Sequence, residues 1–381
     1  MYRSRCKGAE PEPYSVPNAN KRLYLIPVLS KALDVLEMLQ NESQPMTLEE
    51  IHRRTRVSKT TVYRVLKTFV HRGYVAQSQD GTYRHVANPR KICFGFGGQS
   101  EDMPFSVEVT KSLTDAASNA GVDLLVLDNR YDGPTAIANA EKFVQRRVDL
   151  VIELQVEHEV APIIGDKIAA AGIPLIAIDI PHPHATYFGV DNYRVGHEAG
   201  ELLSRFAVSE WEGNANWVLG LDLPEAGQLV QSRISGAFEA VRAAMPGLPV
   251  EAFVRLDGRG LRDKSAKIIG EFLDRHPRDK HILIAAATDT SALGAVDAAR
   301  SRKREKQVAI VGQDCIADAL VEMKRKSSPM IGSVSHEISS YGPALMSLGL
   351  SILRGQTVPP YNYISHRLIT KDSLQSAQDI A

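Results

Sequence analysis

The chain has 381 residues, enough for two or three domains, and its 44% hydrophobic and 24% charged residues are ordinary for a globular protein. No apolar run approaches the roughly 18 residues of a membrane span. Cys6, Cys93 and Cys315 have no spacing typical of a disulfide framework or a zinc site. Composition therefore excludes a transmembrane protein and a disulfide-stapled secreted domain. We expect a cytoplasmic protein that needs no metal and no cofactor.

The formal net charge is zero, with 45 basic and 45 acidic residues, but the charges are unevenly distributed. Residues 22–90 contain eleven Lys and Arg against six Asp and Glu, whereas residues 91–381 contain thirty against thirty-seven. A basic segment followed by an acidic one predicts contact with nucleic acid at the N-terminal end only. Residues 1–21 hold three prolines and no apolar core of a signal peptide, so they are expected to form a disordered tail.

The first expected helix runs from Lys21 to Asn41. Its apolar residues recur at spacings of three and four and predict a core face made of Leu29, Ala32, Leu33, Leu36 and Leu39. A second, shorter helix is expected over residues 48–55, because Thr47 and Glu50 have the spacing of a capping box. Two helices therefore precede the basic segment that follows.

A basic helix is expected to begin after Ser58, whose hydroxyl is a good N-cap, and to end at Gly73, a left-handed C-cap. Its apolar face is made of Val62, Val65, Leu66 and Phe69. The opposite face carries Lys59, Thr60, Tyr63, Arg64 and Lys67. No acidic residue occurs from Arg53 to Gln79, whereas a solvated amphipathic helix usually carries both signs of charge. This excess favours a helix that contacts phosphates over an idle surface helix.

Two strand-like runs follow, at residues 74–77 and 82–86, around Asp80-Gly81, a strong signal for a hairpin turn. Two short helices joined by a tight turn, the second of them basic, match a helix-turn-helix, and the hairpin would be its wing. We therefore predict a winged helix-turn-helix, all-α with a β-hairpin wing, over residues 22–88. Residues 87–90 form a very short linker, so the next domain should lie close to the wing.

These residues resemble the DNA-binding domain of IclR-type transcription regulators. The resemblance rests on segments 28–39, 46–51, 59–68 and 73–75, which occur in the family's order. It implies contact with the major groove and its backbone through the basic helix, and with an adjacent phosphate through the wing. The residues expected to contact DNA are Ser58, Lys59, Thr60, Thr61, Tyr63, Arg64, Lys67 and Arg84. A homodimer would present two such helices to a two-fold operator.

From Lys91 the sequence alternates apolar strands with helices. The first series of expected strands is 92–96, 123–128, 150–153 and 174–179, with helices at 104–120, 135–146 and 160–171. The second series has strands at 216–220, 251–254, 281–285, 308–311, 331–334 and 361–364, with helices at 194–206, 232–244, 264–274, 291–300, 317–326 and 341–354. Such alternation predicts parallel sheets covered on both faces, and the restart predicts two doubly wound α/β lobes with a cleft between them.

This layout resembles the type I periplasmic binding protein fold, as in ribose-binding protein and the sensor domains of LacI-type repressors. The resemblance spans residues 91–370 and rests on motifs at 103–105, 176–179, 189–192, 233–238, 288–295 and 311–314, and on His336. It implies that the chain crosses between lobes near residues 190, 336 and 363. One lobe would be residues 91–190 with 337–362, and the other residues 191–336 with 363–381.

Several expected ligand residues lie just past the C-terminal ends of strands, where open α/β sheets bind ligands. Carboxylates there accept hydrogen bonds from neighbouring hydroxyls, an arginine donates several at once, and Phe105 would cover an apolar sugar face. The predicted ligand-binding set is Met103, Phe105, Glu153, Asp179, Arg233, Thr288, Asp289, Asp314 and His336. Five positions depart from the pattern of sugar binders, so ribose itself is not expected. They are Met103, Ser106, Glu153, Ile180 and Gly258.

Two classes of function compete. In the first, the chain is a sequence-specific transcription regulator whose affinity for a double-stranded DNA operator is controlled by a small sugar-like effector. In the second, it is a sugar-processing enzyme, such as a kinase, that carries a DNA-binding head. The second is disfavoured because the sequence has neither a GxxxxGK[ST] loop nor a G-x-S-x-G elbow. A transport binding protein would not need the DNA-binding head.

The sequence leaves two questions about the cleft open. Its acidic residues would suit either a neutral polyol or a cationic ligand, and nothing indicates whether the effector releases the protein from DNA or recruits it. His182-Pro183-His184 has a spacing seen in metal sites, but no third ligand is evident, so no metal is predicted.

Overall fold

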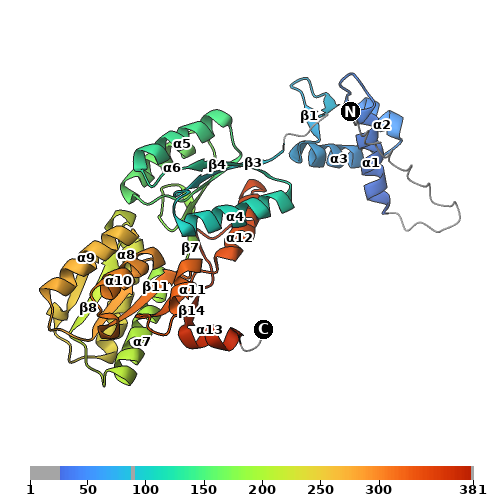
Figure 1. Cartoon of the computed structure of the whole chain (residues 1–381). Coiled ribbons are helices and arrows are strands. Elements are labelled where there is room, and N and C mark those ends of the chain that lie inside the picture. Colours follow the sequence, from blue (N-terminus) through green and yellow to red (C-terminus); the bar gives the residue numbers. More distant parts are fainter. Residues whose placement is uncertain (1–25, 87–90, 379–381) are drawn as a thin grey trace, which may run out of the picture. The chain divides into compact units, whose positions relative to one another are not determined.

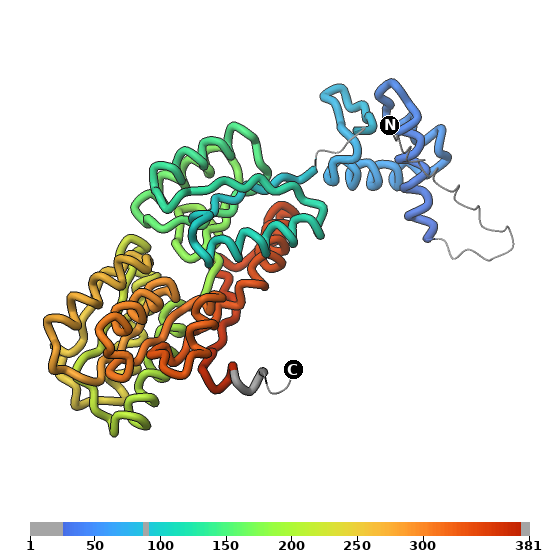
Figure 2. The backbone as a smooth tube through the Cα atoms, in the orientation of Figure 1, coloured from blue at the N-terminus to red at the C-terminus, as the bar shows by residue number. Residues whose placement is uncertain are grey.

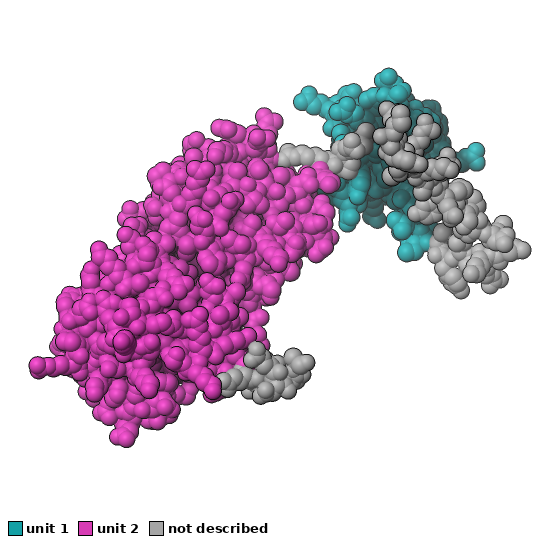
Figure 3. Space-filling model, viewed as in Figure 1, with its two compact units in different colours: residues 1–90 teal, residues 91–381 magenta. Residues whose placement is uncertain are grey.

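The computed structural model describes residues 26–86 and 91–378. The chain divides into two compact units, Met1–Arg90 and Lys91–Ala381 (Figure 3). The predicted tail at residues 1–21 and the predicted linker at residues 87–90 lie outside the described residues.

The first unit is a winged helix-turn-helix, as predicted. Its elements are α1 (Pro27–Gln40), α2 (Leu48–Thr55), α3 (Lys59–His71), β1 (Val75–Gln77) and β2 (Tyr83–His85) (Figure 1). Strands β1 and β2 pair antiparallel, and Met46 bridges to Tyr83 beside them. The capping box of Thr47 and Glu50 is present, and Gly81 has the positive φ of 84° that the wing turn requires.

The core face of α1 differs from the prediction. Val35 and Leu39 are fully buried, whereas Leu29 and Leu33 are 53% and 46% exposed. The core of this unit contains only residues from Ala32 onward in α1, and Val28 and Leu29 in the first turn line a surface groove with residues of α3. Periodicity correctly found an apolar stripe, but it does not reveal how much of that stripe the neighbouring helices cover.

The first lobe of the second unit contains a six-stranded parallel sheet of order β13-β7-β6-β5-β3-β4. Its strands are β3 (Cys93–Gly98), β4 (Asp123–Asp128), β5 (Leu150–Glu153), β6 (Leu175–Ile178), β7 (Ala185–Gly189) and β13 (Tyr361–Tyr363). Helices α4 (Pro104–Ala120) and α12 (Tyr341–Leu353) pack on one face, and α5 (Gly133–Arg146) and α6 (Ala161–Ala170) on the other (Figure 1). Strand β7 was not among the predicted strands.

The second lobe contains a six-stranded sheet of order β14-β12-β11-β10-β8-β9. Its strands are β8 (Trp217–Asp222), β9 (Phe253–Asp257), β10 (Ile282–Ala286), β11 (Val308–Asp314), β12 (Met330–Ser335) and β14 (Arg367–Thr370). Only β14, which the sequence did not predict, runs antiparallel to its neighbour. The sheet lies between α7 (Asn192–Glu210) with α8 (Gln228–Ala244) and α9 (Arg262–Arg275) with α10 (Asp289–Ser301). Two shorter helices, α11 (Ala317–Met323) and α13 (Lys371–Gln378), complete it.

The chain passes between the two sheets more than once. It leaves the first sheet after β7, returns to it after β12 and leaves again after β13 (Figure 2). Both sheets therefore have the predicted doubly wound arrangement, and the carboxyl ends of their strands supply the loops from which a cleft can be built.

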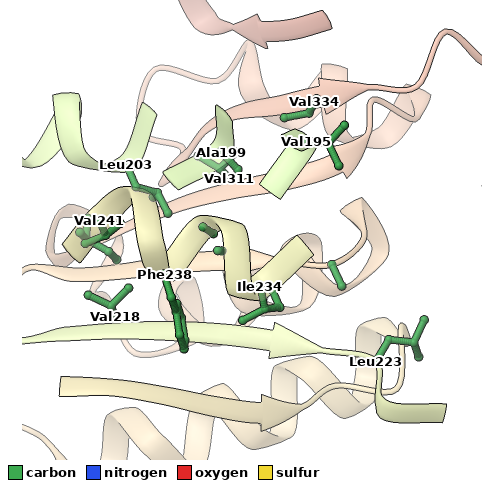
Figure 4. Packing of buried hydrophobic residues seen from close by; sticks show 14 of the residues in the cluster. Val195, Ala199, Leu203, Val218, Leu223, Ile234, Phe238, Val241, Val311 and Val334 are labelled. Atoms are coloured by element: carbon green, nitrogen blue, oxygen red, sulfur yellow. The ribbon is translucent and has the colours of Figure 1, made fainter. Parts of the chain in front are cut away.

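Helices α7 and α8 pack unusually closely. A Cβ added at Gly196 would lie 1.8 Å from the carbonyl oxygen of Arg233, and one at Gly200 would lie 2.3 Å from that of Ala237. Apolar side chains of both helices then cover β8, β11 and β12 (Figure 4). The backbones can approach in this way only because glycine has no side chain, and this approach determines the position of Arg233.

We expect the substitution Gly196→Ala to destabilise the second unit by about 1–3 kcal/mol, because backbone must move to make room for the methyl group. The measurement is the melting temperature followed by circular dichroism. Gly247→Ala is the matched control, because a Cβ at Gly247 meets nothing within 4 Å. Equal melting temperatures for the two variants would contradict the packing argument.

Candidate functional site

The exposed face of α3 carries the residues predicted to contact DNA. Val62, Val65 and Leu66 are buried against the first unit's core, so the opposite side of the helix faces solvent. The residues exposed there are Ser58, Lys59, Thr60, Tyr63, Arg64 and Lys67, and Thr61 is half-buried. Ser58 caps the helix by accepting a hydrogen bond from the Thr61 N–H at 3.4 Å. The N-terminal turn of α3 is therefore ordered before any DNA arrives.

Both lysines on this face, Lys59 and Lys67, have partners within the unit. Lys59 Nζ lies 2.5 Å from Glu49 Oε2 on α2, and both side chains are about 60% exposed. Such a surface ion pair contributes little to stability and exchanges readily for a phosphate. Lys67 Nζ donates to Gln77 Oε1 on β1 at 3.3 Å and lies 5.7 Å from the Tyr63 ring centroid. It thereby connects α3 to the wing, where Arg84 is exposed on β2.

The second unit has a cavity between its lobes. Its volume is about 50 Å³, so the facing walls of the two lobes leave little space between them. Six predicted ligand residues line it: Met103, Phe105, Asp179, Arg233, Thr288 and Asp314. They come from both lobes, and all but Arg233, in the second turn of α8, lie at the ends of strands or the starts of helices, where open α/β sheets bind ligands.

Arg233 is held rigidly in the wall of this cavity. Its Nε donates to Asn192 Oδ1 at 2.6 Å and its Nη1 donates to the Ala287 carbonyl at 3.0 Å. Its Nη2 lies 3.6 Å from Asp179 Oδ2 in the other lobe. Burial raises the pKa of Asp179, and the Arg233 charge opposes that rise. The ion pair therefore joins the two lobes inside the cavity.

The two acidic residues that line the cavity have unusual backbone conformations. Asp179 follows β6 with φ 60°, and Asp314 ends β11 with φ 100°. Residues other than glycine rarely adopt such positive φ values, and those that do are concentrated in binding and active sites. Asp179 Oδ1 is buried without a hydrogen-bond partner in the described part of the chain. This oxygen is available to accept a hydrogen bond from a ligand.

Three predicted ligand residues lie behind the wall instead of in it. Glu153 accepts a hydrogen bond from Asn129 Nδ2 at 2.8 Å, and burial raises its pKa to about 8. Asp289 accepts from Ser333 Oγ at 2.7 Å and from the Ile316 N–H at 3.0 Å, and burial raises its pKa to about 7. His336 is fully buried. None of these three residues lines the cavity.

Much of the cavity wall is apolar, which sequence reasoning missed. Leu154, Val156 and Ile180 line it from the first lobe, and Leu223, Ala226 and Val230 from the second. Ile180 and the three residues of the second lobe belong to one buried cluster, of which Leu223 lies at one end (Figure 4). The lobes therefore meet through apolar as well as polar contacts. The apolar residues just after β5 and β8 are the feature of the sequence that could have predicted this apolar wall.

Polar contacts between the lobes were also missed. Tyr131 Oη donates to the Arg259 carbonyl at 2.7 Å, and a Cβ at Gly260 would lie 2.9 Å from that hydroxyl. His158 Nδ1 lies 3.0 Å from the Glu225 carbonyl. The Tyr131 side chain also lines the cavity, whereas Gly258 does not. No sequence signal joins positions so far apart.

No group of three or more His, Cys, Asp or Glu side chains that could hold a metal occurs in residues 26–86 and 91–378. His182 Nδ1 lies 2.8 Å from the Ile180 carbonyl, and burial lowers its pKa to about 4. His184 instead lies 3.3 Å from Asp166. In the same described ranges no helix has the length and apolar character needed to cross a membrane.

Glu153 yields a test of the electrostatics. Its pKa is about 8 in the folded chain and about 4.3 when unfolded, so between these values the folded state binds one more proton. Stability then falls as pH rises, by about 1.4 kcal/mol per pH unit. We expect Glu153→Gln to remove this slope, so that the wild-type melting temperature falls relative to the variant between about pH 5 and pH 8. Parallel curves would show that Glu153 is ionised in the fold.

Comparison with known proteins agrees with this geometry. A family model described as a periplasmic binding protein domain matches residues 94–357, and one described as an IclR helix-turn-helix domain matches residues 28–79. The HTH-type transcriptional regulator DegA of Bacillus subtilis (strain 168) is 26% identical over 244 residues, which are 63% of this chain and 67% of DegA.

Solved structures share the fold of the second unit. A solute binding protein from Actinobacillus succinogenes 130z with bound D-allose has a TM-score of 0.66 at 19% identity, covering 75% of this chain and 100% of that protein. A solute binding protein from Bacillus halodurans C-125 with bound myo-inositol has a TM-score of 0.65 at 18% identity, covering 78% of this chain and 100% of that protein. The periplasmic binding protein model covers more than half of this chain. The chain therefore belongs to the periplasmic binding protein domain family, with an IclR helix-turn-helix domain at its N-terminal end.

Proposed function

We propose that this chain is a DNA-binding transcription regulator whose affinity for an operator is controlled by a small polar effector, a sugar or sugar derivative, bound between two α/β lobes. The observation that carries the proposal is the presence, in one chain, of an exposed basic α3 and of a cavity in which Arg233 faces Asp179 from the other lobe. The similarity to DegA, named as a regulator, supports the first part. The D-allose and myo-inositol in the similar structures support the second.

On the DNA side, Arg64 is the residue we expect to read a base, because its fork of donors matches the two acceptors of guanine in the major groove. Lys59, Lys67 and Arg84 would neutralise phosphates, so binding should weaken steeply as salt rises. We further propose a homodimer in the cytoplasm, because two α3 helices related by a two-fold axis would match a palindromic operator.

On the effector side, the cavity offers both donors and acceptors. Gln155 Nε2 and Asp179 Oδ1 are buried without partners in the described part of the chain, and both residues line the cavity. Unpaired buried polar atoms are costly, so a hydroxylated ligand that pairs with them gains affinity. The Phe105 ring and the apolar wall would cover the less polar face of such a ligand.

We infer that the lobes move as residues 91–190 with 337–362 and residues 191–336 with 363–381. The cavity of about 50 Å³ is smaller than a hexose, so binding requires the lobes to separate and close again. An effector can shift this equilibrium only by as much as its affinity differs between the two states. Its effect on DNA binding should therefore have the same limit.

We propose binding without catalysis. The side chains that line the cavity include no serine, cysteine or histidine, so the described wall lacks the serine–histidine and cysteine–histidine pairs on which many hydrolases depend.

We expect Arg64→Ala to weaken binding to the operator by about 1–3 kcal/mol, roughly 5- to 150-fold, and to relax preference at one base pair. The operator would first be selected from genomic fragments with the purified full chain, and affinity then measured by fluorescence anisotropy. Arg146→Ala, an exposed arginine of the second unit, is the control and should bind as the wild type does. Unchanged affinity for Arg64→Ala would remove α3 from the reading surface.

We expect a hydroxylated effector to raise the melting temperature, because a ligand that binds only the native state stabilises it. A screen with D-allose, myo-inositol, glycerol and other polyols and sugar acids is the measurement. Asp179→Asn should abolish the rise, whereas the exposed Asp166→Asn should retain it. An effector that stabilises both variants equally would bind elsewhere, and one that leaves operator affinity unchanged would separate binding from regulation.

A further inference from the structure

Three buried polar side chains adjoin the cavity from the second lobe. Gln313 and Asp314 are the last residues of β11, and His336 follows β12. Their exposed fractions are 1%, 6% and 0%. Of the three, only Asp314 lines the cavity.

The orientation of the Gln313 amide is determined by its neighbour on α7. Its Nε2 lies 3.2 Å from the Val195 carbonyl oxygen, which can only accept a hydrogen bond. The amide nitrogen must therefore face Val195, and Oε1 faces His336 Nε2 at 3.2 Å. An amide oxygen also only accepts, so His336 Nε2 carries a hydrogen and donates it.

The other ring nitrogen of His336 faces Asp314. Nδ1 lies 3.3 Å from Asp314 Oδ1, and no group in the described part of the chain, the ionised Asp314 carboxylate included, forms a hydrogen bond to it. If the ring were neutral with its hydrogen on Nε2 and the carboxyl were ionised, two hydrogen-bond acceptors would lie 3.3 Å apart among buried side chains. One proton between the two atoms removes this conflict. Whether that proton resides on nitrogen or on oxygen, the pair has no net charge.

We propose that Asp314 and His336 share a single proton, which the Val195–Gln313 contact stabilises, and that Asp314 meets the effector as one half of this electrically neutral pair. His336 is then a positioning residue, because it acts through Asp314 and does not line the cavity. The inference deepens the proposed function and rests on it only for the identification of the ligand.

Charged and titratable groups on every neighbouring element favour this state. Burial raises the pKa of Asp314 well above its usual value; Arg233 on α8 opposes that rise, and Asp289 on α10 and Asp179 in the first lobe add to it. Burial lowers the pKa of His336 well below its usual value, and Arg233 and His366 lower it further. The Phe105 ring packs edge-on against the imidazole. These directions place the proton mainly on Asp314.

The neutral pair decides which kind of effector the cavity takes. Asp179 is balanced by Arg233, and Asp314 is balanced by the proton it shares, so the lining acids leave no net charge. A cationic ligand would find no free carboxylate, whereas hydroxyl groups would find both donors and acceptors. The alternatives left open by the sequence, a neutral polyol or a cation, are thereby reduced to the polyol.

The direct test is NMR of the full chain labelled with ¹⁵N-histidine. The chain has eleven histidines, and His336→Gln identifies the signal. We expect a ring with hydrogen on Nε2 that does not change between about pH 6 and pH 8.5, whereas an exposed imidazole titrates near about pH 6.5. A ring with hydrogen only on Nδ1, or one that titrates as an exposed ring does, would overturn the proposal.

A second test does not depend on that assignment. Above about pH 7 an unfolded Asp and His hold no proton, whereas the folded pair holds one, so unfolding releases a proton. The wild-type melting temperature should then fall as pH rises from about 7 to 9. For each pH unit, the ratio of the wild-type unfolding constant to that of Asp314→Asn should grow about tenfold. An asparagine at this position donates an amide hydrogen to Nδ1 and has the charge of a protonated aspartate. Glu153 and Asp289 therefore titrate alike in both proteins.

Asp166→Asn is the control and should keep the wild-type slope, because Asp166 is exposed and pairs with His184 on the surface. Parallel slopes for the wild type and Asp314→Asn would overturn the shared proton. Neither test uses DNA or an effector, so a failed search for an operator leaves the result intact. Conversely, a regulator with no shared proton would still bind both.

Discussion

The cleft depends on the buried guanidinium of Arg233. Arginine stays charged inside a protein, so it needs acceptors around it. Two come from its own lobe, Asn192 and the Ala287 carbonyl, and the counter-charge comes from Asp179 in the other. The close contact of α7 and α8 at Gly196 determines where this side chain begins. The packing of α7 against α8, the contact between the lobes and the charge of the cavity therefore all depend on the position of the Arg233 side chain.

The acidic residues around the cavity are neutralised in different ways. Asp179 has Arg233, Asp289 has a hydroxyl and backbone N–H donors, and Glu153 keeps its proton at neutral pH. Asp314 faces His336. Desolvation makes an isolated buried carboxylate costly, so each of these acids has its own local compensation. A wall built in this way is polar without attracting ions, which suits an uncharged hydroxylated molecule.

Sequence reasoning identified the cavity better than it identified the individual side chains. Asp179 and Asp314, both of which the sequence places at the ends of strands, lie in the wall. Glu153 lies behind the wall, and the three residues that follow it, Leu154, Gln155 and Val156, line the cavity instead. Tyr131 and Leu223 escaped notice because each becomes part of the site only through contact with the other lobe.

The sequence by itself determined the winged helix-turn-helix and the two doubly wound sheets, because caps, tight turns and periodicity act within a few residues. The Thr47 capping box, the Ser58 N-cap and the Gly81 turn all form as their local chemistry requires. Only the tertiary structure decided how much of α1 is covered, which strand-end residues line the cavity, and that Asp314 faces His336. These outcomes depend on contacts between distant segments, whose geometry is set by the packing of whole helices and sheets.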